Sequence, residues 1–182
     1  GDALFLDPFG MIAASALPDA VKVSLILELS DASGSRGMVA GQVLDMEGEH
    51  KQLTLAELQT IHANKTGRLL AYPFIAAGLM LELQADIGQL LDKIGKTLGL
   101  AFQVRDDILD LVADFEALGK TPQKDLVAEK STYPVLLGLE ESKALLTSEL
   151  DACEDLLDQI TATCDFDPQA IKKLIEGLRI DG

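Results

Sequence analysis

The stretch "FQVRDDILDLVADFEALGK", residues 102–120, places three aspartates inside an otherwise apolar helical pattern. Apolar residues recur there every three or four positions, which is the spacing of an α-helix with one buried face. Asp106, Asp107 and Asp110 interrupt this face. Burying even one uncompensated carboxylate is costly, so a cluster of three requires a counter-charge.

On a helix, Asp106 and Asp110 share a face, and Asp107 lies about 100° round from Asp106. A pair of adjacent aspartates is most often a solvated acidic surface. These aspartates, however, lie in the middle to late part of their helix, where the helix dipole does not favour negative charge, and beside core-like residues. Clustered carboxylate oxygens are ligands that Mg²⁺ accepts, with waters and substrate phosphates completing its coordination. The pattern therefore indicates a magnesium site.

Two further segments carry positive charge. The polar loop over residues 116–134 contains Lys120, Lys124 and Lys130, and "HANKTGRLL" at 62–70 places Lys65 within a helical stretch. Taken alone, each lysine is ordinarily solvated, because its stem can cover apolar surface while the ammonium reaches water. Together with the aspartates, these segments offer carboxylates for a metal and ammonium groups for phosphate oxygens. That combination suits a diphosphate ester.

The composition predicts an all-α helical bundle forming a single domain over residues 1–182. The chain is 48% hydrophobic, which suits one sizeable core, and it has no Trp. Alternating strand patterns are missing, and Thr54 with Glu57 forms a capping box. Glycines 34, 37 and 41 suit close approach of a helix to another helix or to a ligand. The expected helices are 3–16, 19–33, a stretch within 38–49, 54–83 bent at Pro73, 86–115, 134–162 and 169–178.

Charge and hydropathy exclude several classes of function. The formal charge is −15, with 30 acidic and 15 basic residues, which argues against nucleic acid and against an anionic membrane surface. The apolar run 69–81 is too short to span a bilayer and fits a buried core helix. Cys153 and Cys164 lack the spacing of a zinc site, and we interpret them as reduced thiols in a cytoplasmic protein. The start, "GDALFLDPFG", does not resemble a signal peptide.

"FQVRDDILD" at 102–110 resembles the second aspartate-rich motif of the trans-isoprenyl diphosphate synthases, the farnesyl and geranylgeranyl diphosphate synthase family. Four other blocks resemble that family in the same order, so the resemblance covers essentially the whole chain. The spacing is similar to that of the bacterial short-chain enzymes. The blocks are "GDALF" at 1–5, "GMVAGQVLDME" at 37–47, "NKTGRLL" at 64–70 and "GKTPQKDLVAEKSTYPVLLG" at 119–138.

The resemblance implies a bundle of the isoprenoid synthase type. It also implies a Mg²⁺-dependent prenyltransferase that condenses isopentenyl diphosphate with an allylic diphosphate, dimethylallyl or geranyl, and releases diphosphate. Asp106 and Asp110, assisted by Asp107, would hold Mg²⁺ against the allylic diphosphate. Lys65 and Lys120 would contact the same diphosphate, with Lys130 closing from the loop.

The remaining roles implied by the resemblance are supporting ones. The Thr66 hydroxyl, the Gln103 amide and the backbone around Lys65 would face the carbocation left when diphosphate departs. Asp125 would support the metal's ligands from outside, and Gln42 and Asp45 would line the same cavity. Tyr133 and Pro134 are interpreted as structural residues that start the next helix.

The chain departs from the family in one respect: it contains no first aspartate-rich motif and none of the arginines that follow it. We therefore expect N-terminal helices to be missing, half of the metal site to be absent, and the 182 residues alone to be inactive and prone to aggregate. A homodimer is expected, with 69–81 and 86–104 as candidate contact segments. Two alternatives stay open, a non-catalytic or truncated partner subunit of a prenyl synthase and an acidic bundle with no ligand.

Overall fold

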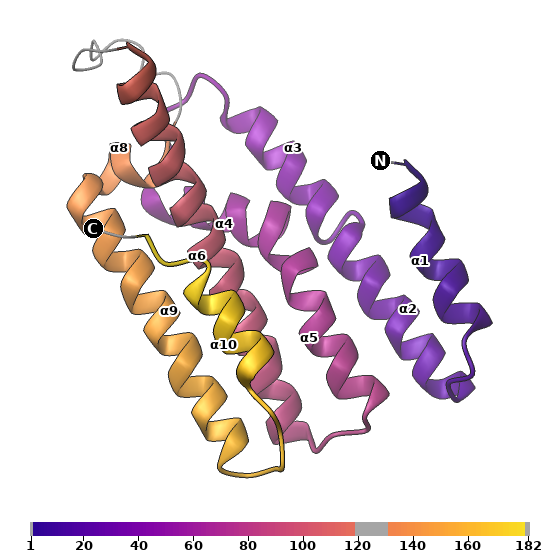
Figure 1. The fold of residues 1–182 in the computed structure, drawn as a ribbon. Coiled ribbons are helices and arrows are strands. Elements are labelled where there is room, and N and C mark those ends of the chain that lie inside the picture. The colour runs from indigo at the N-terminus through magenta and orange to yellow at the C-terminus, as the bar shows by residue number, and fades with distance from the viewer. Residues whose placement is uncertain (1, 119–130, 181–182) are drawn as a thin grey trace.

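The computed structural model describes residues 2–118 and 131–180, which form helices and no strand (Figure 1). The predicted all-α fold is confirmed. No helix in these two ranges is both long enough and apolar enough to cross a membrane. The elements are α1 (Asp2–Ala14), α2 (Asp19–Ser33), α3 (Met38–Gly48), α4 (Leu55–His62), the π-helix η1 (Ala63–Gly67), α5 (Arg68–Met80), α6 (Ala85–Leu118), α8 (Tyr133–Leu137), α9 (Leu139–Thr161) and α10 (Gln169–Glu176).

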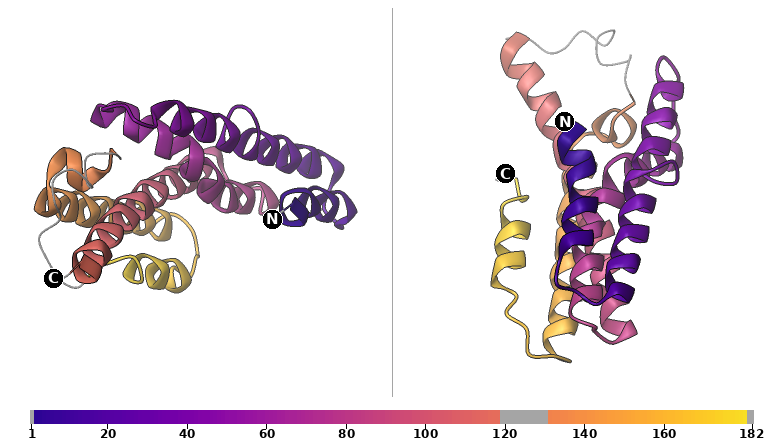
Figure 2. Two further views of the ribbon diagram at one scale, coloured as in Figure 1. Left: turned by 90° about the horizontal axis from the view of Figure 1, so that it is seen from above. Right: turned by 90° about the vertical axis from the view of Figure 1, so that its right-hand side faces the viewer.

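The helices lie side by side in the order α1, α2, α5, α6 and α9, each contacting the next (Figure 1). Helix α3 continues upward from α2 and contacts η1. Helix α6 is the longest element and rises past the end of α5 (Figure 1). The two further views in Figure 2 show that α10 packs on the outside of the bundle, beside α9.

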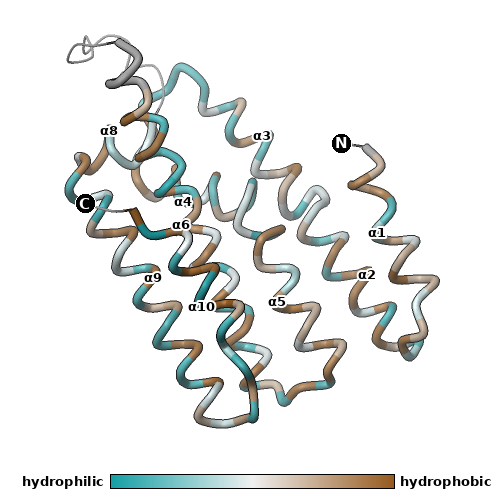
Figure 3. The backbone as a smooth tube through the Cα atoms, in the orientation of Figure 1, coloured by the Kyte–Doolittle hydropathy of each residue, from teal (hydrophilic) through white to brown (hydrophobic). Residues whose placement is uncertain are grey.

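The largest part of the core lies between α6 and α9. Ile94, Val104 and Ile108 of α6 are fully buried, as are Leu150 and Leu157 of α9. Figure 3 shows the corresponding alternation of hydrophobic and hydrophilic residues along α9, which is how an amphipathic helix covers a core. The helices at the N-terminal end differ, because they leave large apolar residues exposed. These are Leu4, Leu6 and Met11 of α1 and Val23 and Leu27 of α2.

Small residues set the distance between α6 and its neighbours on the other side. A Cβ atom at Gly95 would lie 2.5 Å from the Ala71 Cα atom, and one at Gly99 would lie 2.7 Å from the Gly67 Cα atom. The exposure of the residues in this segment corrects the expectation that 69–81 forms a buried core helix. Only the small residues Ala71, Ala76 and Gly78 of α5 are buried. The large residues Leu69, Leu70, Met80 and Leu81 remain exposed.

Two expected helices are divided in the structure. The helix expected over 54–83 is interrupted by η1, ten residues before the bend expected at Pro73. The helix expected over 134–162 is interrupted at Gly138, which has φ of 94° and separates α8 from α9. This left-handed backbone conformation is one that glycine adopts without steric cost, so Gly138 allows the chain to change direction between the two helices.

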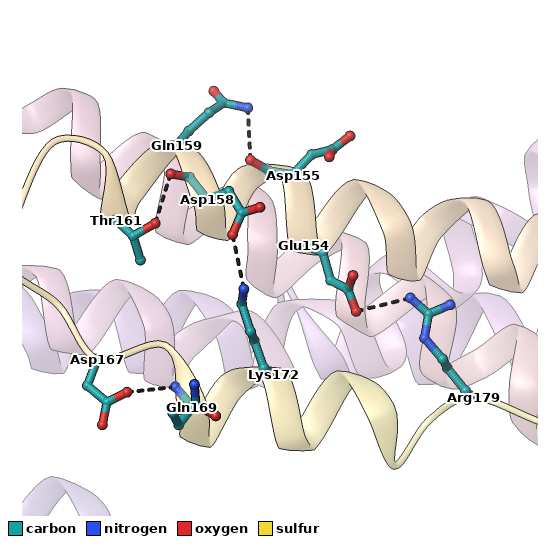
Figure 4. A network of polar contacts seen from close by, with 9 residues as sticks. All are labelled: Glu154, Asp155, Asp158, Gln159, Thr161, Asp167, Gln169, Lys172 and Arg179. Carbon is teal, nitrogen blue, oxygen red and sulfur yellow. Dashed lines mark hydrogen bonds and ion pairs between the residues drawn. The ribbon is translucent and has the colours of Figure 1, made fainter.

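The C-terminal helix α10 is fixed to α9 by one buried apolar residue and by ion pairs. Ile175 is fully buried against the core. An Arg179 Nη lies 2.8 Å from Asp151 Oδ1. The same nitrogen lies 3.0 Å from Glu154 Oε1, and Lys172 Nζ lies 3.1 Å from Asp158 Oδ1 (Figure 4). The hydrogen bonds to Asp151 and then Glu154 raise the pKa of Arg179. The predicted helix over 169–178 is therefore present and docked.

The predicted capping box at the start of α4 is confirmed and gives a pH-dependent expectation. The Thr54 N–H donates to Glu57 Oε2 at 2.8 Å, and the Glu57 N–H donates to Thr54 Oγ1 at 3.3 Å. The backbone hydrogen bond from Thr54 holds the pKa of Glu57 below its usual value of 4.5. The ionised side chain thus stabilises the fold above that unfolded value, and this stabilisation is lost as pH falls through the lower folded pKa.

We therefore expect Glu57→Gln, which resembles protonated glutamate, to lower the melting temperature at pH 7 and to have a smaller effect at pH 3. Thermal unfolding of both proteins across this range checks the expectation. Glu49→Gln removes a carboxylate just outside the capping box and controls for the change in net charge. A deficit of Glu57→Gln that is the same at both pH values would contradict the argument.

Candidate functional site

The π-helix η1 holds Lys65 between α3 and α6. The Arg68 N–H donates to the Ala63 carbonyl oxygen, an i to i−5 hydrogen bond that widens the helix at this point. A Cβ atom at Gly41 of α3 would lie 2.1 Å from the Lys65 backbone nitrogen. Gly99 of α6 packs closely against Gly67, the last residue of η1. Short π-helical insertions occur frequently at functional sites, and this one is fixed by two contacts with glycine backbone.

The side chain of Lys65 is paired with Asp45. Lys65 Nζ lies 2.5 Å from Asp45 Oδ2, and the side chains are 33% and 29% exposed, respectively. Asp45 follows Gly41 by four residues and so lies on the same face of α3. The close approach at Gly41 therefore brings the two side chains together. Gln42 is exposed on α3 beside this pair, and Thr66 is half-buried next to Lys65.

Asp106 and Asp110 lie on the face of α6 that contacts η1. Helical periodicity places both residues on the same side as Gly95 and Gly99, about two and three turns further along from Gly99. Both are exposed, in the second half of α6. Gln103 lies between these two levels and is only 9% exposed. The helix thus carries a glycine contact, a buried amide and two exposed carboxylates along one side.

The three aspartates of "RDDILD" do not share one environment. Among residues 3–113 and 131–180, whose side chains the structure describes, no salt bridge involves Asp106 or Asp110. Asp107, in contrast, is half-buried, and its Oδ2 accepts a hydrogen bond of 2.9 Å from the Tyr133 N–H. Within the same residues, no group of three or more His, Cys, Asp or Glu side chains is arranged to hold a metal ion. Of the three aspartates in this motif, two are exposed, Asp106 and Asp110.

A groove of about 810 Å³ runs between α2, α5 and the first half of α6. Its α5 wall includes Tyr72, whose hydroxyl donates to the Leu25 carbonyl of α2 at 3.3 Å. Its α6 wall includes Asp92 and Lys96. Asp92 precedes Asp110 by five full turns, and Lys96 precedes Gln103 by nearly two, so this wall lies on the same side of α6 as the candidate site. The groove and the site share a continuous helix face.

The structure therefore arranges most of the expected site residues in two groups, one on α3 and η1 and one on α6, and η1 contacts α6. Lys120, Asp125 and Lys130 lie outside the described residues. Sequence reasoning anticipated a close approach at Gly41 from the glycines in its segment, but it missed the equivalent contact at Gly99 and the π-helix. Gln42, Asp45, Lys65 and Thr66 form the α3–η1 group, and Gln103, Asp106 and Asp110 form the α6 group.

The chain is thus an all-helical bundle in which η1, with Lys65, packs against α6, whose same side carries Asp106 and Asp110. The polyprenyl synthetase family model matches residues 1–172, and the chain belongs to that family. It is 47% identical over 176 residues to the farnesyl diphosphate synthase of Micrococcus luteus and 40% identical over 184 residues to that of Escherichia coli. Each match covers 97% of this chain and 60% of the relative.

A solved structure shows the same arrangement of helices. The geranyltransferase of Helicobacter pylori, complexed with magnesium and isoprenyl diphosphate, superposes with a TM-score of 0.76 at 29% sequence identity. The match covers 97% of this chain and 57% of that protein. The chain thus spans about three fifths of the length of the relatives that it matches.

Proposed function

We propose that the protein containing this chain is a prenyltransferase of isoprenoid biosynthesis. It would join isopentenyl diphosphate to an allylic diphosphate: the allylic carbon–oxygen bond breaks, a carbon–carbon bond forms, and diphosphate and a proton leave. The observation that carries this proposal is the packing of η1, which holds Lys65, against the side of α6 that carries Asp106 and Asp110 further along. The similarity to two farnesyl diphosphate synthases supports it.

The donor set of the site fits magnesium. Mg²⁺ is commonly bound by one or two carboxylates, with waters and substrate phosphates completing its octahedron, rather than by a cage made entirely of protein. Asp106 and Asp110 provide two exposed carboxylates one turn apart, and these are the residues that would hold the ion. When bound, Mg²⁺ neutralises charge that develops on the departing diphosphate. The H. pylori geranyltransferase complexed with magnesium and isoprenyl diphosphate supports the assignment.

The chain's own residues would bind and orient the allylic substrate. Lys65 would donate from Nζ to a diphosphate oxygen, and Asp45 would hold the lysine ammonium in place before the substrate arrives. Fixing the ammonium in advance reduces the conformational entropy that binding must overcome. The close packing of Gly41 and Gly99 on η1 serves the same purpose, because it fixes the backbone from which Lys65 extends. Lys120 and Lys130 would add charge from the segment that the structure does not describe.

Two polar side chains are suited to face the reacting carbon. Gln103 is nearly buried on the α6 face between the glycine contact and the aspartates, and Thr66 follows Lys65 on η1. Their side-chain oxygens would be directed at positive charge on the allylic fragment, which an oxygen dipole stabilises without supplying a nucleophile. The apolar packing of α5 and α6 below them would exclude water from this carbon.

The test is pyrophosphate release by the full-length gene product that contains this chain. We expect release when isopentenyl diphosphate and either dimethylallyl or geranyl diphosphate are both present with Mg²⁺. We expect none when one substrate is omitted or when Mg²⁺ is removed with a chelator and not restored. The lipid product, extracted and identified by mass, reports the chain length. A folded protein that gives no release under these conditions is not a prenyltransferase of this type.

A further inference from the structure

The middle aspartate of "RDDILD" has a hydrogen-bond partner at the start of α8, whereas the outer two have none among the residues that the structure describes. Asp107 is half-buried, and its Oδ2 accepts the Tyr133 N–H at 2.9 Å. Asp106 and Asp110 are exposed on the side of α6 that faces η1. Asp107 lies about 100° round the helix from Asp106, so its carboxylate is directed at α8 and not at η1. The motif therefore presents carboxylates in two different directions.

Asp107 accepts a hydrogen bond from the backbone N–H at the start of α8. Tyr133 is the first residue of α8, and its N–H has no partner within the helix. Thr132, the N-cap residue, uses its Oγ1 for the Val135 N–H at 3.4 Å. Asp107 therefore completes the capping of α8 from a different helix, 26 positions earlier in the chain. Such a charge-assisted hydrogen bond is stronger than a neutral one.

The residues on either side of this hydrogen bond are also fixed. Ser131 Oγ accepts from the Leu53 N–H at 3.1 Å and donates to the Lys51 carbonyl oxygen at 3.3 Å, which ties it to the connection between α3 and α4. The Tyr133 ring is fully buried, 5.5 Å from the His62 ring at the end of α4. Residues 131–133 are thus attached to α4, to the α3–α4 connection and, through Asp107, to α6.

We propose that Asp107 is a positioning residue and not a metal ligand. It holds the start of α8 against α6 and so fixes the rotation of α6 that turns Asp106 and Asp110 toward η1. The catalytic part of this assignment rests on the proposed function, whereas the structural part does not. Its chemistry is a backbone hydrogen bond accepted by a half-buried carboxylate, a task that asparagine performs weakly and alanine not at all.

The test compares Asp107→Asn and Asp107→Ala with Asp106→Asn in the full-length gene product. Hydrogen exchange followed by mass spectrometry reports on the peptide over residues 131–137. We expect exchange there to accelerate about tenfold or more in both Asp107 variants, and to remain at the wild-type rate in Asp106→Asn. Ser131→Ala should accelerate the same peptide, because it removes the neighbouring attachment. An unchanged exchange rate in Asp107→Ala would overturn the assignment.

Magnesium dependence separates positioning from metal binding. We expect Asp107→Asn to lower kcat while leaving the Mg²⁺ concentration for half-maximal activity within about twofold of wild type, whereas Asp106→Asn should raise it by about tenfold or more. An equal rise in the two variants would make Asp107 a metal ligand and would overturn the proposal. If the wild-type protein releases no pyrophosphate at all, the proposed function fails. The exchange measurement then still decides whether Asp107 anchors α8.

Discussion

Replacing Asp106 by asparagine is expected to lower kcat for pyrophosphate release by about 10²–10³-fold. The side chain is exposed on α6, so the substitution removes no buried contact and leaves the helix intact. Asparagine keeps one acceptor oxygen but loses the negative charge, and a neutral oxygen attracts a divalent cation less strongly than a carboxylate does. The loss should therefore appear in the chemical step and in the Mg²⁺ requirement. Steady-state release of pyrophosphate at several Mg²⁺ concentrations measures both.

The matched control for this substitution is Asp155→Asn, which removes one exposed carboxylate from α9. It makes the same change in net charge at a position outside the candidate site, and wild-type kinetics are expected. Melting temperatures of both variants should lie close to that of wild type. Near-wild-type turnover of Asp106→Asn at all Mg²⁺ concentrations would show that the exposed carboxylates of α6 do not hold a catalytic cation.

Replacing Gly41 by alanine is expected to lower the free energy of unfolding by about 3 kcal/mol. The new Cβ atom would lie 2.1 Å from the Lys65 backbone nitrogen and 2.5 Å from its Cα atom, and backbone on both sides cannot yield as a flexible side chain could. Helix α3 must then move away from η1, and the Lys65–Asp45 ion pair must lengthen. For a chain of this size the melting temperature should fall by roughly 6–12 °C.

Gly88→Ala is the control, because nothing lies within 4 Å of a Cβ atom at Gly88 in α6. Alanine there should stabilise the helix by about 0.5–1 kcal/mol through its higher helix propensity. The two substitutions have the same chemistry and opposite expected signs. A Gly41→Ala protein as stable as wild type would mean that α3 does not approach η1 as closely as the structure indicates.

The helical fold could be predicted because its determinants are local. The spacing of apolar residues predicted α2 over 19–33, as observed, and α6 to within three residues at each end, and Thr54 with Glu57 marked the start of α4. The divisions at η1 and at Gly138 could not be predicted in the same way. A π-turn leaves no periodic signature over five residues, and a glycine between two apolar helical segments is compatible with a continuous helix.

The candidate site could be predicted as a set of residues but not as an arrangement. Lys65, Asp106 and Asp110 follow from charge placed within helical patterns, and their separation of about forty residues says nothing of distance. What brings their helices into contact is Gly99 packing against Gly67, two residues without side chains. The different environment of Asp107 was equally hidden, because its partner is a backbone N–H, and any residue except proline supplies one.

The π-helix η1 also acts as a phase shift. An i to i−5 hydrogen bond holds one more residue per turn than an α-helical one, so α5 is advanced by one position, about 100°, relative to α4. A helical wheel drawn continuously over residues 55–80 and aligned on α4 would therefore assign the residues of α5 to the wrong faces. With the shift, α4 turns Leu58 and Ile61 into the core while α5 presents Ala71 to Gly95. Lys65 lies in η1 itself, and so belongs neither to the core-facing side of α4 nor to the side of α5 that packs on α6.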